Sequence, residues 1–440
     1  ISNIGEYQEN AYNYVINQIR EDFPSFTKME SGVGYQILAN PLQILNMSYP
    51  SKNFDDGDKN IKLYGVGGLN RTMTYDKSTK INFSYKQEVL DNYGRIFSSE
   101  EIFKYSGKIS SICEHIKKSK GIVLIYSAYL NGGCVPLALA LEEMGFIRYG
   151  GRSLFKEQSS PRINALTMEP IKNPKEPVAS YAMITGDQKL SPRNKDEIDW
   201  CTNEDNINGE KVKVVIISKA GSEGLDFKNI RQVHILEPWY NLNRIEQIIG
   251  RAVRFCSHIK LPFEKRNTEI YLYGTRLTED DVEAADLYVY RLAEAKAISI
   301  SEVARILKEN AVDCLLNKAQ IDLSVENLNQ KVKQELSSGV TITYEVGDHP
   351  HSAICDYMDK CIYACKPSQD DIIINKDTYN EQFIIMNLEK IIIKIRNLMK
   401  EQYIYKKEDL IHGITRIKKF PIEQIYAALN QLITDKNEYI

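Results

Sequence analysis

Two stretches of the chain decide its fold: residues 218–227 read S-K-A-G-S-E-G-L-D-F, and residues 247–254 read Q-I-I-G-R-A-V-R. The first directly follows the apolar run Lys211–Ile217, which is typical of a buried parallel strand. Open α/β sheets bind ligands at such strand ends, where glycines let backbone amides approach a phosphate and Asp226 can accept a ribose hydroxyl. The pattern therefore predicts a phosphate-binding loop at the edge of a sheet.

The second stretch carries two arginines. Gln247, Arg251 and Arg254 lie at i, i+4 and i+7, so a helix over Leu242–Arg254 places them on one face. Gly250 has no side chain, so another surface can approach the helix closely beside these residues. Two guanidinium groups suit a polyphosphate, because each fork binds phosphate oxygens and stays charged. A lone R-x-x-R pair is usually only an exposed helix, but strand, glycine loop, strand and arginine helix in this order form a more specific signal.

Apolar runs of strand length alternate with helical patterns on both sides of these stretches. The alternation predicts an α/β fold, a RecA-like parallel sheet with helices on both faces, interrupted by a polar surface insertion over Lys156–Pro177. The expected strands are Gly121–Tyr126, Val178–Ile184, Lys211–Ile217, Gln232–Leu236 and Glu269–Tyr273, and the expected helices are Lys108–Lys118, Pro136–Met144, Lys195–Cys201 and Leu242–Arg254.

Four regions are expected. Residues 1–104 read as an irregular linker with one helix over Tyr7–Ile19, and residues 105–276 as the α/β lobe. Residues 277–370 read as a helical extension, with a helix over Glu279–Asn317 and a cysteine-bearing loop. Residues 371–440 show three helical patterns, over Ile384–Met399, Lys407–Arg416 and Pro421–Leu432.

The last region has the outline of a winged helix. Arg416, Lys418 and Lys419 precede its final helix, where basic side chains of a winged helix meet a phosphate backbone. The other interpretation is that the unit only braces the lobe and that the three charges are solvated.

The length, net charge and hydropathy of the chain limit the classes of function that it can have. The chain has 440 residues, enough for about three domains, and a net charge of −3, which argues against a general nucleic-acid coat but leaves room for a local basic groove. No apolar run reaches the length of a membrane span, so no membrane partner is expected. The first residue is not Met, which suggests an excerpt of a longer protein.

The eight cysteines show no paired framework, which favours a reducing, intracellular compartment. His351, Cys355, Cys361 and Cys365 are spaced so that they could surround zinc, but their spacing misses the usual C-x₂-C knuckles. Buried structural cysteines are the preferred interpretation, and no metal ligand is assigned.

The two stretches resemble motifs V and VI of the C-terminal RecA-like lobe of superfamily-2 helicases. The run between them and C-S-H-I-K-L-P at Cys256–Pro262 are similar to nucleic-acid-dependent NTPases of large cytoplasmic DNA viruses. These are the poxvirus phosphohydrolase and early-transcription-factor type and their giant-virus relatives. The resemblance is strong over Lys104–Gly274 and weaker toward the C-terminus.

This resemblance implies a role for each matching residue. Arg251 and Arg254 become arginine fingers that reach ATP on another lobe. The implied nucleotide contacts are Gln247, Gly224 and Asp226, and the implied nucleic-acid contacts are Ser127, Ser218 and Gly221. It further implies ATP and Mg²⁺ as cofactors held mainly by a first lobe, and as partners DNA or RNA, that upstream lobe and the viral transcription machinery. The expected location is the host cytoplasm or the virion.

The sequence contains neither a G-x-x-x-x-G-K-[ST] phosphate loop nor an acidic strand-end motif for Mg²⁺. Gly107-Lys108 is interpreted as a helix start, His234 as a core histidine and Trp239 as a packing residue rather than a stacking platform. The leading hypothesis is the second lobe of a viral superfamily-2 helicase, inactive as an ATPase by itself. The alternative is a non-catalytic nucleic-acid-binding or transcription-complex scaffold that retains one RecA-like lobe.

Overall fold

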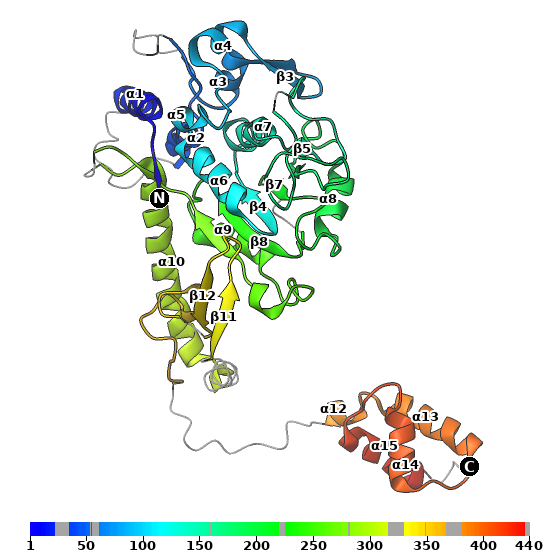
Figure 1. Cartoon of the computed structure of the whole chain (residues 1–440). Coiled ribbons are helices and arrows are strands. Elements are labelled where there is room, and N and C mark those ends of the chain that lie inside the picture. Colours follow the sequence, from blue (N-terminus) through cyan, green and yellow to red (C-terminus); the bar gives the residue numbers. More distant parts are fainter. Residues whose placement is uncertain are drawn as a thin grey trace. The chain divides into compact units, whose positions relative to one another are not determined.

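The computed structural model describes residues 1–22, 35–52, 54, 61–158, 160–219, 225–279, 282–315, 330–347, 349–366 and 381–435. The chain divides into two compact units, Ile1–Cys365 and Lys366–Ile440, each of which is described by itself (Figure 1).

The larger unit is built on a six-stranded sheet in the order β5-β6-β7-β4-β8-β9, and every pairing in it is parallel. The strands are β4 (Ile122–Tyr126), β5 (Ile147–Arg148), β6 (Ser180–Ile184), β7 (Val214–Ile217), β8 (Ile230–Ile235) and β9 (Glu269–Leu272). Five of the six lie where apolar runs predicted strands. The sixth, β5, has only two residues, too few to form a run in the sequence.

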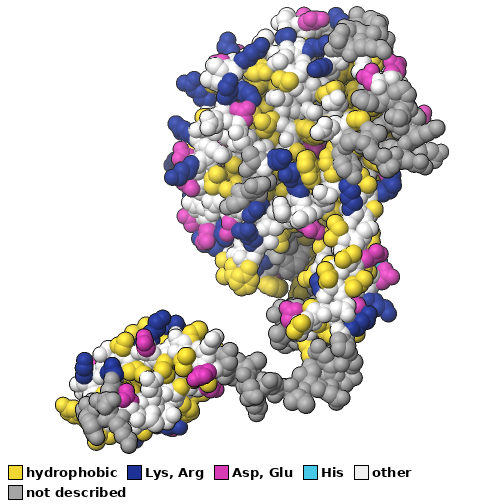
Figure 2. Space-filling view, turned by 180° about the vertical axis from the view of Figure 1, so that it is seen from behind, with side chains coloured by type: hydrophobic (Ala, Val, Ile, Leu, Met, Phe, Trp, Pro, Cys, Tyr) yellow, Lys and Arg dark blue, Asp and Glu magenta, His cyan; other side chains and the backbone are white. Residues whose placement is uncertain are grey.

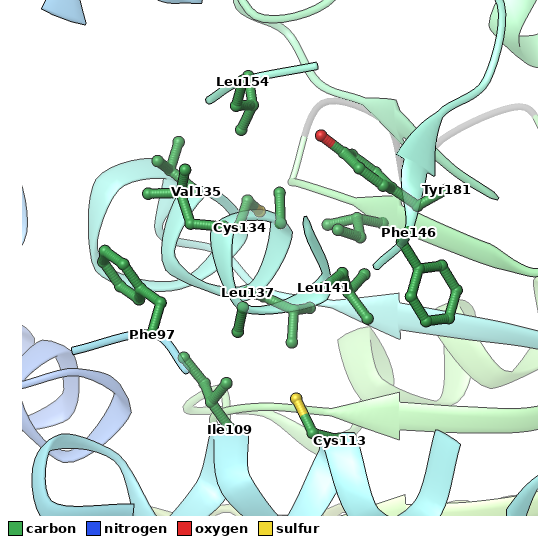
Figure 3. Packing of buried hydrophobic residues seen from close by; sticks show 14 of the residues in the cluster. Phe97, Ile109, Cys113, Cys134, Val135, Leu137, Leu141, Phe146, Leu154 and Tyr181 are labelled. Carbon is green, nitrogen blue, oxygen red and sulfur yellow. The ribbon is translucent and has the colours of Figure 1, made fainter. Parts of the chain in front are cut away.

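Both faces of the sheet are buried, because alternate strand residues enter different apolar clusters. Val123 and Ile125 of β4 join the cluster formed with α6 (Gly107–Lys118) and α7 (Val135–Glu143). The remaining residues of β4 join a second cluster, which is formed with α8 (Asn194–Thr202) and α9 (Leu242–Ala252). Figure 3 shows the first cluster, with Ile109 and Cys113 of α6 facing Leu137 and Leu141 of α7. The expected α/β architecture with helices on both faces is confirmed.

The expectation that residues 1–104 form an irregular linker is wrong. This region forms several short elements, and Met47, Tyr49 and Phe83 from it are buried in the same cluster as α6 and α7. Each element buries only a few apolar residues, so no single period is visible in the sequence. The elements are β1 (Ser2–Asn3), α1 (Glu6–Asp22), η2 (Tyr35–Leu38), α2 (Ala39–Asn46), α3 (Gly65–Thr72), β2 (Met73–Asp76), β3 (Ile81–Tyr85), α4 (Gln87–Tyr93) and α5 (Ile102–Tyr105).

The extension after the sheet begins with β10 (Thr275–Arg276), which pairs with β1. The long helix α10 (Ala285–Asn310) follows and is shorter than the predicted Glu279–Asn317. Its second half leaves Ile300, Val303 and Leu307 exposed, and Figure 2 shows apolar side chains along this helix.

An antiparallel hairpin, β11 (Lys331–Glu335) with β12 (Thr341–Glu345), was not predicted. It packs at the amino end of the sheet, where the amide of Lys120 donates to the carbonyl of Ser337 at 2.8 Å.

The cysteines of the extension form two disulfides, contrary to the expectation of an unpaired set. Cys314 bonds to Cys365, and Cys355 bonds to Cys361. The first pair joins residues 51 positions apart, a link that no local spacing reveals. Within the described ranges, no group of three or more His, Cys, Asp or Glu side chains is placed to hold a metal ion. None of the described helices combines the length and apolar composition that a membrane crossing requires.

The smaller unit is helical, with α12 (Glu381–Ile385), α13 (Leu388–Glu401), α14 (Lys407–Thr415) and α15 (Ile422–Thr434). The predicted helix Ile384–Met399 is therefore two helices, broken before Asn387. Ile391, Ile395, Leu410 and Ile425 are buried, and Leu398, Ile411 and Leu429 pack partly buried against them. The wing of a winged helix would follow α15, where residues 436–440 lie outside the described residues.

A buried ion pair joins distant parts of the larger unit. The Lys108 ammonium of α6 lies 2.6 Å from the Asp286 carboxylate at the start of α10, and both side chains are at most 1% exposed. Lys108 also donates to the carbonyl of Leu236 after β8, at 3.2 Å. Thr275 donates to Asp286 from its amide and its hydroxyl. The pair therefore holds one helix, the sheet edge and the extension together.

We expect Asp286→Asn to lower the free energy of unfolding by about 3–5 kcal/mol, because it leaves the Lys108 ammonium buried without a countercharge. Urea unfolding followed by tryptophan fluorescence measures this change in the larger unit, which contains both tryptophans, Trp200 and Trp239. Glu283→Gln is the control, since the Glu283–Arg291 pair is exposed and contributes little. Equal destabilisation of the two variants would contradict the assigned importance of the buried pair.

Candidate functional site

Ser218, the first residue of the predicted loop, lies at the carboxyl edge of the sheet. Ser218 follows β7 directly, is 4% exposed, and donates its amide to the carbonyl of Ile184 at 3.1 Å. Gly221 and Gly224 fall in residues 220–224, outside the described residues. The described chain resumes at Leu225, so Asp226 is placed and the two glycines remain predictions.

Ser127 is not available for the phosphate contact predicted for it. Its side chain is 1% exposed, and its hydroxyl donates to the carboxylate of Glu237 at 2.9 Å. Gly133 packs so closely that a Cβ there would lie 2.0 Å from the Ser127 oxygen. The prediction fails because a buried acid, rather than solvent, faces this strand end.

Glu237 is the buried acid that the sequence did not single out. It follows β8 and is 1% exposed, and its carboxylate accepts hydrogen bonds from the Asn46 amide at 2.7 Å, from Ser127, and from the amide of Ala128. Burial raises the pKa of Glu237, while these donors and the nearby Lys108 oppose that rise. The sequence signal that could have identified Glu237 is its position directly after the apolar run Gln232–Leu236. An acid at the end of a buried strand is itself buried only when it has partners, so this position indicates a hydrogen-bonded carboxylate.

The arginine helix ends earlier than predicted. Helix α9 stops at Ala252, Val253 has φ −103° and ψ 86°, and Arg254 lies beyond the helix. The reason is local. The Ser257 hydroxyl donates to the carbonyl of Ala252 and accepts the amide of Arg254, each at 3.2 Å, and so satisfies groups that a continuing helix would use.

The two decisive stretches nevertheless meet. The amide of Phe227 donates to the carbonyl of Arg251 at 3.2 Å, and Arg251 Nη1 lies 3.5 Å from the carbonyl oxygen of Leu225. Arg254 Nη1 lies 3.8 Å from Asp226 Oδ1, an ion-pair distance too long for a hydrogen bond. The other Asp226 oxygen accepts from Lys228 at 2.8 Å. The Asp226 carboxylate therefore lies beside two cations, while its Oδ1 has no hydrogen-bond donor among the described residues, and its contact with a ribose stays a prediction.

The arginines lie at an open surface. Arg254 keeps 44% of its side chain exposed, Arg251 is half-buried and Gln247 is exposed. A Cβ on Gly250 would meet no atom within 4 Å, so packing inside the described unit does not require glycine there. Arg254 and the face of α9 at Gly250 are therefore open within the described unit.

The Gly107-Lys108 pair does not form a phosphate site. Gly107 opens α6, with the Ser106 hydroxyl accepting the amide of Ile109 at 3.0 Å, and Lys108 is in the buried ion pair with Asp286. The helix-start interpretation is confirmed.

The aromatic residues near the site are packed. Arg244 places its guanidinium 4.1 Å from the centre of the half-buried Trp239 ring, consistent with the packing interpretation. His234 is fully buried, with Nδ1 2.8 Å from the Tyr273 hydroxyl and Nε2 3.1 Å from Gln232 Oε1. Burial, together with nearby His115, lowers the pKa of His234 to about 3, so this core histidine is neutral.

Known proteins share this pattern. The model of the helicase conserved C-terminal domain matches residues 150–256, which contain both decisive stretches. A putative ATP-dependent RNA helicase of Acanthamoeba polyphaga mimivirus, L377, is 25% identical over 90% of this chain and 39% of its own length. A second mimivirus protein of that description, R350, is 39% identical over 50% of this chain and 25% of its own length.

A termination factor NPH-I homolog of African swine fever virus is 33% identical over 38% of this chain and 26% of its own length. The chain thus spans about two fifths or less of the length of these curated relatives. Among solved structures, the C-terminal part of the Fun30 ATPase domain is 12% identical with a TM-score of 0.38, covering 67% of this chain and 87% of that one.

In the 440-residue chain, Gly250→Ala should raise the free energy of unfolding by about 0.5–1 kcal/mol, because alanine favours a helix interior and its Cβ meets nothing. Urea unfolding measures the change. Gly133→Ala is the contrasting variant and should destabilise, since its Cβ collides with Ser127. A destabilised Gly250→Ala chain would show that this face is covered.

Proposed function

We propose that this chain is the second RecA-like lobe, with its extension, of an ATP-dependent nucleic-acid helicase or translocase, because residues 150–256 match the helicase conserved C-terminal domain. The observation that carries the proposal is the contact between the segment Leu225–Phe227 and the segment Arg251–Arg254 at an uncovered edge. A catalytic surface completed by another lobe requires such an edge.

In this proposal, Arg251 and Arg254 act as arginine fingers. A guanidinium group stays charged at any physiological pH and binds phosphate oxygens in a fork. Such a group placed against a transferring phosphoryl group contributes roughly 10³–10⁵ in rate. ATP and Mg²⁺, held mainly by the upstream lobe, would supply the phosphoryl group and its counter-charge. Asp226 orients Arg254 through the 3.8 Å ion pair, and exposed Gln247 contacts the nucleotide from α9, the helix that carries Arg251.

Nucleic acid is proposed to bind along the carboxyl edge of the sheet, at Ser218 and the Gly221 loop. Ser127 is omitted, because its hydroxyl is bonded to Glu237. The relatives' descriptions as RNA helicases and as a termination factor support a role in viral transcription.

The finger assignment is tested in a longer protein in which this chain follows a lobe with a phosphate loop. There, Arg254→Ala should lower kcat for nucleic-acid-stimulated ATP hydrolysis by about 10² or more, since the contact is made mainly in the transition state. Nucleic-acid affinity, measured by fluorescence anisotropy, should persist. Arg291→Ala is the control, because Arg291 lies on α10 in an exposed pair with Glu283.

The 440-residue chain alone should show no hydrolysis above background. Turnover by this chain comparable to that of the longer protein would contradict the proposal. Normal turnover by Arg254→Ala would instead favour a scaffold that retains the lobe without using its arginines.

The smaller unit is proposed to contact duplex backbone through Arg416, Lys418 and Lys419, which are all exposed before α15. In the full chain, replacing the three with Gln should flatten the dependence of log affinity on log salt by about 0.9 for each phosphate that is no longer neutralised. The matched control replaces exposed Lys390, Lys400 and Lys406 with Gln. A slope that changes equally in both variants, or in neither, leaves the unit as a brace.

A further inference from the structure

A cleft of about 650 Å³ lies apart from the arginine surface, between the β2–β3 hairpin and the carboxyl ends of β5 and β6. Its volume is in the range of sites for small organic ligands. Ser78 and Thr79 of the hairpin turn form one wall. The opposite wall comes from the residues that follow β5 and from α8, including Gly150 and Trp200.

The cleft is strongly basic. Its lining includes Arg148, Arg152, Lys189 and Arg193 but only one carboxyl group, that of Glu197. Four positive charges against one negative charge leave +3 locally, in a chain whose net charge is −3. Such a concentration of charge attracts an anionic ligand.

Three of these cations keep their charge available. Arg193 donates only to the carbonyl of Gly150, and Lys189 only to the carbonyl of Lys77, at 3.0 and 3.2 Å, so neither forms an ion pair within the described ranges. Arg152 is exposed and has no hydrogen bond or ion pair to any described residue. Uncompensated guanidinium and ammonium groups at the rim of a cleft are typical phosphate contacts.

The cleft also contains a buried acceptor. Glu197 is 2% exposed, and its Oε1 accepts from Arg148 Nη2 at 2.7 Å and from Nε at 3.2 Å. Its Oε2 is buried and has no hydrogen-bond partner among the described residues. A buried carboxylate oxygen without a donor is costly, and a ligand N–H group would satisfy it.

An aromatic surface adjoins this acceptor. Trp200 lines the cleft, half-buried, with its ring edge-on to Tyr149 at 5.0 Å between centroids. Gly150 has φ +63°, and a Cβ there would lie 2.2 Å from the indole, so only glycine lets the chain pass this ring. Aromatic rings in basic grooves are platforms for nucleobases.

The position of the cleft connects it to the proposed nucleic-acid edge. In the sheet order, β6 is the neighbour of β7, which Ser218 follows, and β5 is the next strand outward. Adjacent strands lie about 4.8 Å apart, so the cleft begins roughly 5–10 Å from the strand end at Ser218. A nucleic-acid strand that passes Ser218 along this edge would reach it within a few nucleotides.

We propose that this cleft holds one unpaired nucleotide of the nucleic-acid strand on which the lobe acts. Phosphates contact Arg152, Lys189 and Arg193. The base lies against Trp200 and donates an amino hydrogen to Glu197 Oε2. This inference rests on the proposed function and adds a subsite to it, with selectivity for bases that carry an exocyclic amino group.

The test uses the full 440-residue chain and labelled single-stranded oligoribonucleotides of twelve residues, all cytidine or all uridine. These bases differ at C4, where cytosine has an amino group and uracil a carbonyl oxygen. The N3–H group of uracil lies between two carbonyl oxygens, which a carboxylate repels. Anisotropy should show about fivefold to tenfold tighter binding of oligocytidylate. Glu197→Gln should reduce this preference, because its amide offers both a donor and an acceptor. The variant also leaves Arg148 buried without a countercharge, so its binding is compared at a temperature where circular dichroism shows a folded chain.

Two further measurements locate the binding site. In the Trp239→Phe background, Trp200 is the only tryptophan, and oligocytidylate should quench its fluorescence. Replacing Arg152 and Arg193 with Gln should flatten the salt dependence by about 0.7 for each phosphate that these arginines neutralise. The control replaces exposed Lys172 and Lys175 with Gln, which removes the same charge from the surface insertion.

Several outcomes overturn the inference. They are equal affinity for the two oligonucleotides, unquenched Trp200, equal slopes in the Arg and Lys double variants, and displacement of oligocytidylate by polyglutamate at equal charge. Binding that persists unchanged in the Arg double variant rules out the cleft as the nucleotide site but leaves the proposed function intact. If no oligonucleotide binds, and Arg254→Ala keeps normal ATPase activity in the longer protein, both the nucleotide site and the proposed function are ruled out.

Discussion

The buried ammonium group of Lys108 is the constraint on which the rest of the larger unit depends. A charge at 1% exposure is stable only with a countercharge and full hydrogen bonding, so Asp286 must reach it from a segment 178 positions away in sequence. That requirement fixes the start of α10 against the sheet. Asn46 and the carbonyl of Leu236 approach the same ammonium, at 3.4 and 3.2 Å, and bring the end of α2 to the end of β8.

Glu237 extends this constraint to the site. Its carboxylate uses the hydroxyl of Ser127 and the amide of Asn46, so the carboxyl ends of β4 and β8 are committed to internal polar contacts. The surface left for ligands at this edge lies where Leu225–Phe227 meets Arg251–Arg254, and farther along at β5 and β6. Strand ends that are held by internal polar contacts beside an open edge suit side chains that must keep their geometry when another domain docks.

Charge is distributed unevenly over this edge. A net charge of −3 describes the whole chain, yet the cleft beside β5 and β6 gathers four basic side chains around one acid, and Arg254 faces solvent beside Asp226. Nucleic-acid and nucleotide contacts depend on such local fields, which fall off within about 10 Å at 0.1 M salt. The overall charge therefore says little about the partners of this lobe.

The sequence by itself determined the sheet, most of its helices and the helicase resemblance, which rests on residues 218–227 and 247–254. These features can be read from the sequence because buried parallel strands and glycine loops leave local patterns. Only the tertiary structure decided that Ser127 is buried, that α9 stops before Arg254, that residues before Lys104 pack into the core, and that Cys314 pairs with Cys365. Each of these depends on a partner distant in sequence or on competing hydrogen bonds, as when Ser257 takes the groups that would continue the helix. A periodic pattern reports the face that a residue occupies, but the group that it meets there is set by the packing of the whole chain.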